Sequence, residues 1–331
     1  MKPDEPWIIV GQGLAGTCLA WQLWRRNAPF VVCDSGAGGS SRIAAGMVNP
    51  ITGKNFHPGA DVARCIPESV AFYRECETIP GETFWHPLPI LRLASTPGEW
   101  RKISSKLHDP DVLRWLSDKQ APVVPGWEGA VVIDGGGRLD VRAFLDASRD
   151  FFIANGVYET RNCDLSSSTP RHIWCDGAAG LISGRHGPHR CAKGEMLVLD
   201  APSWDQTMIR IGGGGWLVPL GEGLFKTGST YDWDDLSSAP TAAGRRTIEM
   251  IATKLADENF RVISHEAGIR PILRRSDPLI GPLAENGWMF NGLGSKGSVY
   301  APGVAHRLAH WLLDGTPPEP HYDIRRFFPG P

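Results

Sequence analysis

Short apolar runs alternate with glycine-rich turns at both ends of the chain, and longer alternating segments fill its middle. Near the start, residues 7–10 lead into a glycine-rich turn, a helical pattern and a second apolar run at residues 30–33. Toward the end, residues 289–290 lead into the turn at 292–297 and a helical pattern over 298–313. The chain thus begins and ends with strand–turn–helix units, which are typical of a parallel sheet covered by helices.

Between these units the apolar pattern indicates a strand-rich, antiparallel region. Residues 64–78 have helical spacing, and residues 79–130 alternate short strands with Pro/Gly turns. From 196 to 230, alternating segments separated by glycine clusters predict antiparallel sheet. Three shorter features complete the pattern: a helix N-capped by Asp140 with apolar positions 141, 144, 145, 151 and 152, a buried strand meeting a glycine turn at 173–177, and an amphipathic helix over 240–257.

The first glycine-rich turn reads Gly11-Gln12-Gly13-Leu14-Ala15-Gly16. A GxGxxG turn between strand and helix lets backbone N–H groups and the helix N-terminus face a pyrophosphate. Asp34 closes the second strand, close to the roughly 20-residue spacing expected for a carboxylate that binds a ribose 2′-OH. These features predict a dinucleotide site without a 2′-phosphate, and the motif alone does not separate NAD from FAD. A plain helix-entry turn is the alternative for the glycines.

We therefore predict an α/β fold in which a Rossmann-type dinucleotide-binding domain, a parallel sheet with helices, is interrupted by an antiparallel, β-rich α+β domain. The nucleotide-binding domain is expected to be discontinuous and to comprise residues 1–60, 131–195 and 265–331. The expected substrate domain comprises residues 61–130 and 196–264. At 331 residues the chain is long enough for two cores.

Composition narrows the possible partners. Hydrophobic residues make up 42% of the chain and charged residues 21%, and the net charge of −2 favours neither a nucleic-acid nor an anionic-membrane surface. Residues 1–6 carry two acids, and glycines break the apolar run that follows, which is unlike a signal peptide. No run of about 18 apolar residues predicts a membrane span. We expect a cytoplasmic protein with a small-molecule substrate.

Cysteine and histidine spacing argues against several other chemistries. The seven cysteines, at positions 18, 33, 65, 76, 163, 175 and 191, include no CxxC, so reduced thiols are expected. His186 and His189 lie near no cysteine or carboxylate set with a recognisable metal spacing, so no metal site is predicted. No G-x-S-x-G elbow follows a strand, which argues against a serine hydrolase of that type.

Further sequence blocks along the chain carry a family resemblance: Ser40-Ser41 followed by 44–47, then 192–197, 217–219, 228–230, 268–271, 277–281 and 292–302. Together with the opening motif, they resemble the D-amino-acid oxidase superfamily of FAD-dependent oxidoreductases. The resemblance is greatest to the glycine-oxidase-like branch and to the flavin domain of the tRNA-modifying MnmC enzymes. It implies FAD as the cofactor. Non-covalent binding is implied because the sarcosine-oxidase branch attaches its flavin to a later cysteine, and none follows Cys191.

The resemblance also implies which residues contact FAD. Hydroxyls and backbone N–H groups of Ser40 and Ser41 would hold the pyrophosphate, and Gly46 would let the backbone pass beside the flavin ring. Lys296 and the helix N-terminus after it would stabilise the negative charge of the reduced flavin, a solvated loop lysine being the alternative. The full implied set is Gly11, Gly13, Leu14, Ala15, Gly16, Asp34, Ser35, Ser40, Ser41, Arg42, Ala45, Gly46, Met47, Gly177, Gly294, Ser295, Lys296, Gly297 and Ser298.

Arg270 matches the arginine with which amino-acid-oxidising relatives hold the substrate carboxylate in a bidentate pair. Such a clamp would place the α-C–H over flavin N5, and Lys296 is the second residue to which the resemblance gives a catalytic role. A structural arginine paired with a nearby acid is the alternative for Arg270. Trp216 and Tyr231 are the other implied substrate-binding residues.

Several positions depart from the family pattern. Trp216 stands where glycine oxidases have a carboxylate-binding tyrosine, so it offers an indole N–H and no phenol. Ser295 stands where some relatives carry an arginine, and Tyr231 either points into the pocket or is an ordinary strand-end aromatic. These changes leave FAD binding intact and weaken the case for glycine or a simple D-amino acid as the substrate. Arg274 and Arg275 follow closely and are read either as site residues or as part of a turn.

The leading interpretation is an FAD-dependent oxidoreductase that oxidises the C–N bond of a small amine or amino acid. A hydride passes to flavin N5, water hydrolyses the imine, and O2 reoxidises the flavin with release of H2O2; a dehydrogenase is equally compatible with the sequence. The first alternative is an MnmC-like tRNA wobble-uridine modification enzyme, because residues 292–297 resemble that branch, although the chain lacks a basic stripe. The second is a flavin-binding module without turnover. Residues 49–54 resemble a segment near the substrate entrance of uncharacterised relatives, or form a surface turn.

Overall fold

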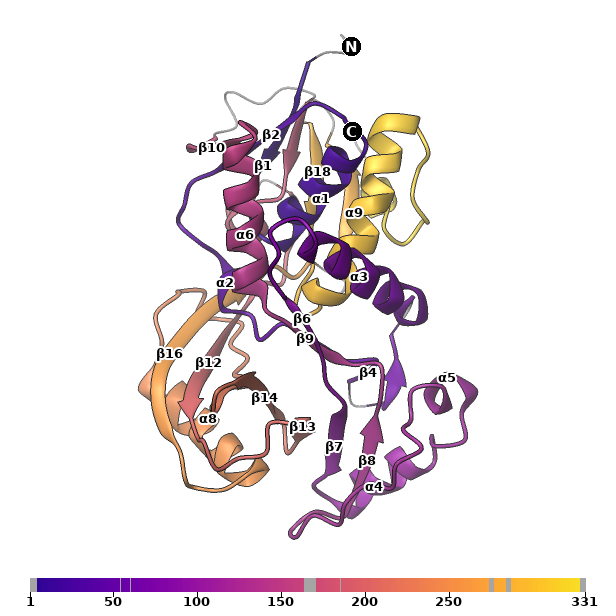
Figure 1. The fold of residues 1–331 in the computed structure, drawn as a ribbon, viewed down its shortest axis with the longest axis vertical. Helices are drawn as coiled ribbons and strands as arrows, with labels where there is room; N and C mark the ends of the chain where they lie inside the picture. The colour runs from indigo at the N-terminus through magenta and orange to yellow at the C-terminus, as the bar shows by residue number, and fades with distance from the viewer. Residues whose placement is uncertain are drawn as a thin grey trace.

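The chain folds into two halves, drawn at the top and bottom of Figure 1, each built on one large sheet. The structure is a computed structural model, and it describes residues 5–53, 55–59, 61–163, 171–184, 186–273, 277–283 and 287–327. None of the helices in these ranges is long and apolar enough to cross a membrane.

The upper half contains a six-stranded sheet whose strands are β1 (Trp7–Val10), β2 (Phe30–Asp34), β10 (Tyr158–Thr160), β11 (His172–Trp174), β17 (Leu279–Pro282) and β18 (Trp288–Asn291). Their order is β10-β2-β1-β11-β18-β17, and all pairs are parallel except that of β17 with β18. Five helices belong to this half: α1 (Leu14–Arg25), α3 (Val62–Glu77), α6 (Val141–Ala154), α7 (Gly177–Ile182) and α9 (Gly297–Asp314). This is the arrangement predicted for the nucleotide-binding domain.

The lower half contains a seven-stranded sheet made of β7 (Ile90–Ala94), β8 (Gly129–Ile133), β12 (Ala192–Asp200), β13 (Ile209–Gly212), β14 (Gly215–Gly221), β15 (Leu224–Gly228) and β16 (Arg261–Arg270). The order is β16-β12-β15-β14-β13-β7-β8, and neighbours are antiparallel except β13 with β7. Helix α8 (Ala242–Leu255) covers one face of this sheet, where Leu197, Leu217, Phe225 and Ile248 form a buried cluster. The predicted antiparallel domain is thus present.

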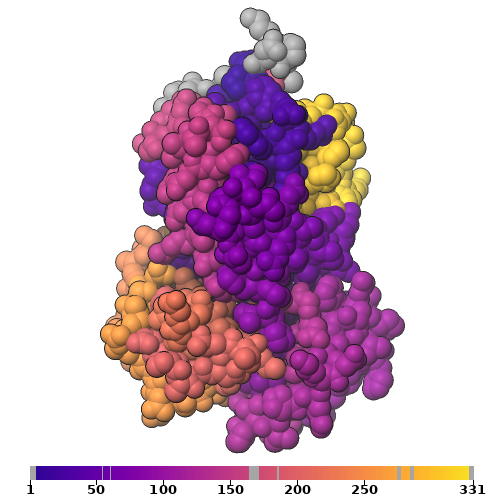
Figure 2. Space-filling view, viewed as in Figure 1, coloured from indigo at the N-terminus to yellow at the C-terminus, as the bar shows by residue number. Residues whose placement is uncertain are grey.

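Short elements connect the two halves. They are the helix α2 (Ser40–Ile43), the three-stranded sheet of β3 (Met47–Val48), β6 (Trp85–Pro87) and β9 (Gly137–Leu139), and the hairpin of β4 (Ile51–Thr52) and β5 (His57–Pro58). Two more helices, α4 (Pro97–Ser104) and α5 (Pro110–Leu113), form a lobe beside this hairpin, and a 3-10 turn spans Ile324–Arg326. The lobe is the magenta surface at the lower right of Figure 2, where an indentation in the outline separates it from the upper half.

Side-chain caps mark the starts of four described helices, α4, α5, α6 and α8. The Asp140 carboxylate accepts a hydrogen bond from Ala143 N at 3.1 Å, so the predicted N-cap of α6 is confirmed. Helices α4 and α5 contradict the interpretation of residues 79–130 as strands and turns alone. Each begins with a proline directly after a capping residue, Thr96 or Asp109, and this is a helix-start signal rather than a turn signal.

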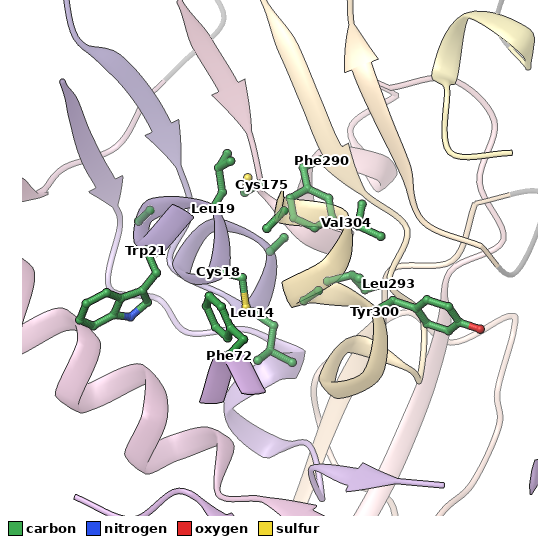
Figure 3. Packing of buried hydrophobic residues seen from close by; sticks show 14 of the residues in the cluster. Leu14, Cys18, Leu19, Trp21, Phe72, Cys175, Phe290, Leu293, Tyr300 and Val304 are labelled. Carbon is green, nitrogen blue, oxygen red and sulfur yellow. The ribbon is translucent and has the colours of Figure 1, made fainter. Parts of the chain in front are cut away.

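The core of the upper half lies between α1, α3 and α9 (Figure 3), where Cys18, Phe72 and Val304 are buried. Helix α3 packs along α9, although the predicted boundary at residue 61 assigns it to the substrate domain. We propose that α3 belongs with the nucleotide-binding domain, and the rest of the division remains a prediction. All seven cysteines have free thiols, as expected.

Candidate functional site: a dinucleotide cradle and a buried arginine

The glycine-rich turn after β1 has no room for side chains. A Cβ added at Gly16 would lie 1.9 Å from the carbonyl oxygen of Gly11, where strand and helix pack together. A Cβ at Gly11 would lie 2.6 Å from the Cys175 carbonyl oxygen, and one at Gly13 would lie 3.1 Å from Ser41 Oγ. Each glycine thus fulfils the packing requirement that a dinucleotide-binding turn places on it.

The predicted ribose-binding acid lies at the same edge of the sheet. Asp34 Oδ2 accepts a hydrogen bond from Gln12 N at 2.7 Å, and its Oδ1 accepts one from Gly36 N at 2.8 Å. A Cβ at Gly177 would meet no atom within 4 Å, so this position faces open space. Gly11, Asp34 and Gly177 stand at the carboxyl ends of adjacent parallel strands, where open α/β sheets bind their ligands.

Two helix N-termini meet beside this turn. Leu14 N donates a hydrogen bond to Ser41 Oγ at 3.2 Å, which joins the start of α1 to α2. A Cβ at Gly297, the first residue of α9, would lie 2.8 Å from Leu14 Cδ1. The positive ends of the α1 and α9 dipoles therefore lie close together, which suits the pyrophosphate of a dinucleotide.

The segment predicted to pass the flavin ring approaches the other half of the molecule. Gly46 has φ +68°, and a Cβ there would lie 1.8 Å from the Leu139 carbonyl oxygen, so only glycine fits. Ala45 and Met47 pack against the same apolar cluster as Trp216 of β14. The structure therefore brings this segment and the predicted substrate-binding tryptophan together.

The other predicted cofactor residues are less uniformly placed. Ser298 is buried, and its carbonyl oxygen accepts a hydrogen bond from Tyr73 at 3.1 Å. Ser35 is exposed. The Arg42 guanidinium forms an ion pair with Asp146 of α6 at 2.8 Å. A bound phosphate would therefore compete with the Asp146 carboxylate for Arg42. Ala15 lies buried in the first turn of α1, and Ser40 begins α2.

Arg270 ends β16 and lies on the sheet face that meets the upper half. Gly268 shares this face because it is two residues away, and a Cβ there would lie 2.3 Å from Ile43 Cδ1 of α2. The guanidinium of Arg270 donates to the Lys193 carbonyl oxygen at 3.1 Å, to Ser229 Oγ at 2.8 Å and to the Thr230 carbonyl oxygen at 3.1 Å.

Both faces of this guanidinium are covered. Its Cζ lies 3.9 Å from the ring centroid of Tyr231, and a Cβ at Gly194 would lie 2.1 Å from Nη2. Burial lowers the pKa of the Arg270 guanidinium. Within the described ranges no carboxylate lies within 4.0 Å of it, so the alternative of a structural arginine paired with an acid is not supported there.

Tyr231 links Arg270 to the loop that precedes α9. The Tyr231 and Ser295 hydroxyls are 2.7 Å apart, and Gly294 N donates to the carbonyl oxygen of Pro271 at 2.9 Å. Both contacts join the substrate-side sheet to the glycine-rich loop of the nucleotide side. Lys296 follows in this loop as the N-cap residue of α9, half-buried, with Nζ 5.8 Å from the Tyr300 ring centroid.

Sequence reasoning missed some of the contacts around Arg270. Ser229 and Thr230 lie in a motif that carried the family resemblance, yet they were not assigned to the site. Lys226 was also missed. It is buried on the same sheet face and donates to Glu266 at 2.8 Å. Burial lowers the pKa of the Lys226 ammonium against the opposing effect of Glu266.

His186 supports the edge of the cradle. It is buried, and its Nε2 lies 3.0 Å from Asp176 Oδ1 beside the predicted cofactor residue Gly177. Asn291 Nδ2 donates to the same Asp176 oxygen at 3.1 Å and to the Gly177 carbonyl oxygen at 3.0 Å. Arg274, Arg275 and Lys54, considered from the sequence, lie outside the described residues.

This geometry agrees with a family comparison. The profile of the DAO family, described as FAD dependent oxidoreductase, matches residues 6–311. The chain belongs to this family. The prediction of FAD as the cofactor is thereby confirmed, and the glycine positions, the Asp34 carboxylate and the paired helix N-termini fit an FAD molecule bound at the carboxyl edge of the upper sheet.

Two curated relatives represent the two branches that the sequence resembles. The MnmC protein of Marinobacter nauticus, a bifunctional protein of tRNA 5-methylaminomethyl-2-thiouridine biosynthesis, is 25% identical over 92% of this chain. The chain spans 55% of the length of that protein. Glycine oxidase of Pseudomonas putida is 22% identical, over 94% of this chain and 95% of its own.

Solved structures share the fold at low sequence identity. Iminodiacetate oxidase from Chelativorans sp. BNC1 superposes with a TM-score of 0.79 at 20% identity, over 96% of this chain and 98% of its own. Glycine oxidase from Geobacillus kaustophilus gives a TM-score of 0.78 at 18% identity, over the same shares of the two chains. The predicted architecture is confirmed by these superpositions.

Proposed function

We propose that the protein oxidises a C–N bond in a small amine or amino acid that carries a carboxylate next to the reacting carbon. When bound, FAD supplies the two-electron acceptor, taking a hydride at N5, and O2 is the proposed terminal oxidant, yielding H2O2. The substrate loses a hydride and a proton to become an imine, which water hydrolyses to a carbonyl compound and an amine. The protein's part is to bind and orient the substrate.

The environment of Arg270 is the observation that carries this proposal. Three of the five guanidinium N–H groups donate to described residues, so donors at its rim remain for a ligand. Both faces of the Arg270 guanidinium are covered, and none of the described carboxylates lies within 4.0 Å of it. Among those residues the buried guanidinium therefore has no counter-ion. A buried cation without a counter-ion is costly, and a substrate carboxylate would relieve that cost.

Tyr231 supplies the phenol that Trp216 does not. Its ring lies against Arg270 and its hydroxyl lies beside Ser295, so the phenol is available next to the carboxylate-binding group. Trp216 would instead form an apolar wall, because its ring lies against Gly228 on the neighbouring strand. We propose that Arg270 and Tyr231 together hold the carboxylate, with Trp216 beside the substrate carbon.

Negative charge on the reduced flavin needs stabilisation from the protein. The proposed source is the N-terminus of α9, including the backbone N–H groups of Gly297 and Ser298, together with the ammonium of Lys296. No ionisable side chain is required to remove a proton if the amine arrives neutral. The glycine oxidase and iminodiacetate oxidase relatives support a substrate with an N–CH2–COO⁻ unit.

The test is an anaerobic titration of the purified holoenzyme with sarcosine, glycine, D-alanine, L-proline and iminodiacetate, followed by its visible spectrum. Bleaching of the flavin by a carboxylate-bearing amine supports the proposal, and bleaching followed by H2O2 release in air supports an oxidase. A flavin that none of these compounds reduces would favour either a binding module without turnover or the tRNA-modifying candidate described next. Acid precipitation should release free FAD, as the proposed non-covalent binding requires.

A second candidate is the MnmC-like modification of tRNA. Its support is the similarity to the Marinobacter nauticus protein over most of this chain. The net charge of −2 argues against it, since RNA affinity depends largely on neutralising phosphates. An anticodon stem-loop bearing a carboxymethylaminomethyl uridine would bleach the flavin if this candidate is correct, whereas small amines would not.

A further inference from the structure

A groove of about 630 Å³ lies between the β4–β5 hairpin and helix α4. Thr52 and Gly59 line its hairpin side. The charged side chains that the structure describes along its lining are all basic: His57, Lys102 and Lys106. Neither the family comparison nor the proposed carboxylate site accounts for these three basic side chains.

One wall of the groove, at Gly59, lies beside the loop next to Arg270. Lys296 Nζ lies 3.6 Å from the position that a Cβ would take at Gly59, on the wall of the groove. Ser295, the preceding residue, contacts the hydroxyl of Tyr231, which stacks on Arg270. A short series of side chains therefore connects the proposed carboxylate site to the groove.

Tyr300 marks the same connection from α9. Its ring belongs to the buried cluster around α1 (Figure 3), and its hydroxyl lies 3.1 Å from the position that a Cβ would take at Gly59. Gly59, which lines the groove, therefore lies beside the first turn of α9.

Two carboxylates, Asp109 and Asp111, lie beside the groove, and their contacts determine whether the groove can attract an anion or a cation. Asp109 binds Lys106 at 3.2 Å, and His57 Nε2 lies 3.9 Å from Asp109 and 4.0 Å from Asp111. This group could hold a cation, but the Lys106 ammonium already occupies the Asp109 carboxylate. No described carboxylate lies within 4.0 Å of Lys102, so its charge is available to an anion.

We propose that this groove binds a second, anionic group of the substrate. The substrate class is then an N–CH2–COO⁻ compound whose nitrogen carries an arm ending in a carboxylate or a phosphate. This inference rests on the proposed function, because it takes Arg270 as the site of the first carboxylate. A small molecule fits better than RNA, since tight RNA binding requires many more phosphate contacts than this groove supplies.

The test compares ligands that differ only in the charge of the arm. N-(2-carboxyethyl)glycine, its amide N-(2-carbamoylethyl)glycine and N-(2-phosphonoethyl)glycine are titrated anaerobically into the holoenzyme, and flavin reduction gives an apparent Kd for each. The two acids should bind more tightly than the amide. In the Lys102→Ala/Lys106→Ala variant this preference should fall by roughly 3- to 20-fold, which two partly exposed ion pairs would supply. The tighter of the two acids shows which terminal group the groove prefers.

Lys119→Ala provides the control, because Lys119 is an exposed lysine that does not line the groove, and it should leave the preference unchanged. Equal affinity for acid and amide, or a preference that survives in the double variant, would overturn the inference. Reduction by sarcosine but by none of the three longer compounds would overturn it as well. In either case the proposed function would stand.

A second measurement does not depend on turnover. The carboxyethyl compound should protect Lys102 and Lys106, but not Lys119, from acetylation as followed by mass spectrometry. If no amine reduces the flavin, the proposed function fails, and protection alone decides whether the groove binds the anion. Protection by an anticodon stem-loop and not by the small acid would overturn the inference in favour of RNA.

Discussion

The Arg270 guanidinium lies against the ring of Tyr231, with Cζ 3.9 Å from the ring centroid. Arg270 comes from the end of β16, and Tyr231 from the loop after β15. A cation held over an aromatic face is stabilised without neutralisation, so its hydrogen-bonding rim stays available. Because the Tyr231 hydroxyl contacts Ser295 in the other half, the orientation of the arginine depends on both halves of the molecule.

Replacing Arg270 by lysine keeps the charge and removes the planar fork. We expect Arg270→Lys to raise the apparent Kd of a reducing carboxylate substrate roughly 10- to 100-fold, the loss of about one charge-assisted hydrogen bond. The visible spectrum of bound FAD should not change. Anaerobic reduction measured over a range of substrate concentrations provides the test. An unchanged Kd would remove Arg270 from the substrate site.

The contact between Tyr231 and Ser295 can be separated from the stacking on Arg270. Tyr231→Phe removes the hydroxyl and keeps the ring, and we expect a roughly 2- to 10-fold weaker substrate affinity from one lost neutral hydrogen bond. Ser295→Ala removes only the contact between the two hydroxyls and leaves the phenol for the carboxylate, so its effect should be smaller. The double variant should resemble Tyr231→Phe, because that change already removes the contact with Ser295. Additive losses would show that the two hydroxyls act on the substrate separately.

Replacing two glycines that have left-handed backbone conformation tests whether close packing at Gly46 is required where the chain would pass the flavin ring. Gly46 and Gly53 have φ values of +68° and +76°, but only at Gly46 would a Cβ meet an atom within 4 Å. Gly53→Ala should cost roughly 1 kcal/mol from backbone strain alone. Gly46→Ala should cost roughly 2–4 kcal/mol, because overpacking is added, and should weaken FAD retention. Urea unfolding and the FAD content of the purified variants test both; equal losses would contradict the steric argument.

The proposed role of Lys296 predicts a change in flavin potential. Lys296→Met keeps most of the side-chain volume and removes the cation, so the anionic reduced flavin should be less stable. We expect the two-electron midpoint potential to fall by roughly 20–60 mV, corresponding to about 1–3 kcal/mol. Lys106→Met, which removes a groove cation outside this loop, is the control and should leave the potential near that of the wild type. Equal potentials in all three proteins would leave Lys296 without this role.

Local patterns were sufficient to predict much of the upper half. The β1–α1–β2 unit and the last strand–turn–helix unit depend on short-range spacing. Their glycines lie in the turns where a strand and the helix that follows it pack closely, only a few residues apart. Arg270 could be predicted because the blocks around it are specific to the family. The partners Ser229 and Tyr231 reach it through pairing of strands β12, β15 and β16, which sequence spacing does not reveal.

The groove could not be predicted for a similar reason. His57 lies on the β4–β5 hairpin, whereas Lys102 and Lys106 lie on and just after α4, and the sequence does not show that these segments meet. Helix α4 is not predicted by the pattern of Pro/Gly turns over residues 79–130, because Pro97 here is the first helical residue after the Thr96 cap. The grouping of these basic residues from two separate elements is therefore visible only in the tertiary structure, although each residue can be seen in the sequence.

The stability of the α3–α9 pair should depend on pH through Glu319. Burial alone would raise the pKa of the Glu319 carboxyl, but its own backbone N–H, Arg64 and Arg307 outweigh that effect and bring the pKa to about 2. A carboxyl whose pKa is lower in the folded than in the unfolded chain stabilises the fold at pH values above its ordinary pKa of 4.5. It loses that contribution as the pH falls toward 2.

Glu319→Gln should therefore lower Tm by roughly 1–3 °C at pH 7, since the carboxylate is about one-third exposed, and this difference should shrink toward zero between pH 5 and pH 2. Glu82→Gln, at an exposed carboxylate with no ion pair among the described residues, should not differ from the wild type at any pH. A Tm difference for Glu319→Gln that is as large at pH 3 as at pH 7 would mean that packing, and not charge, makes Glu319 stabilising.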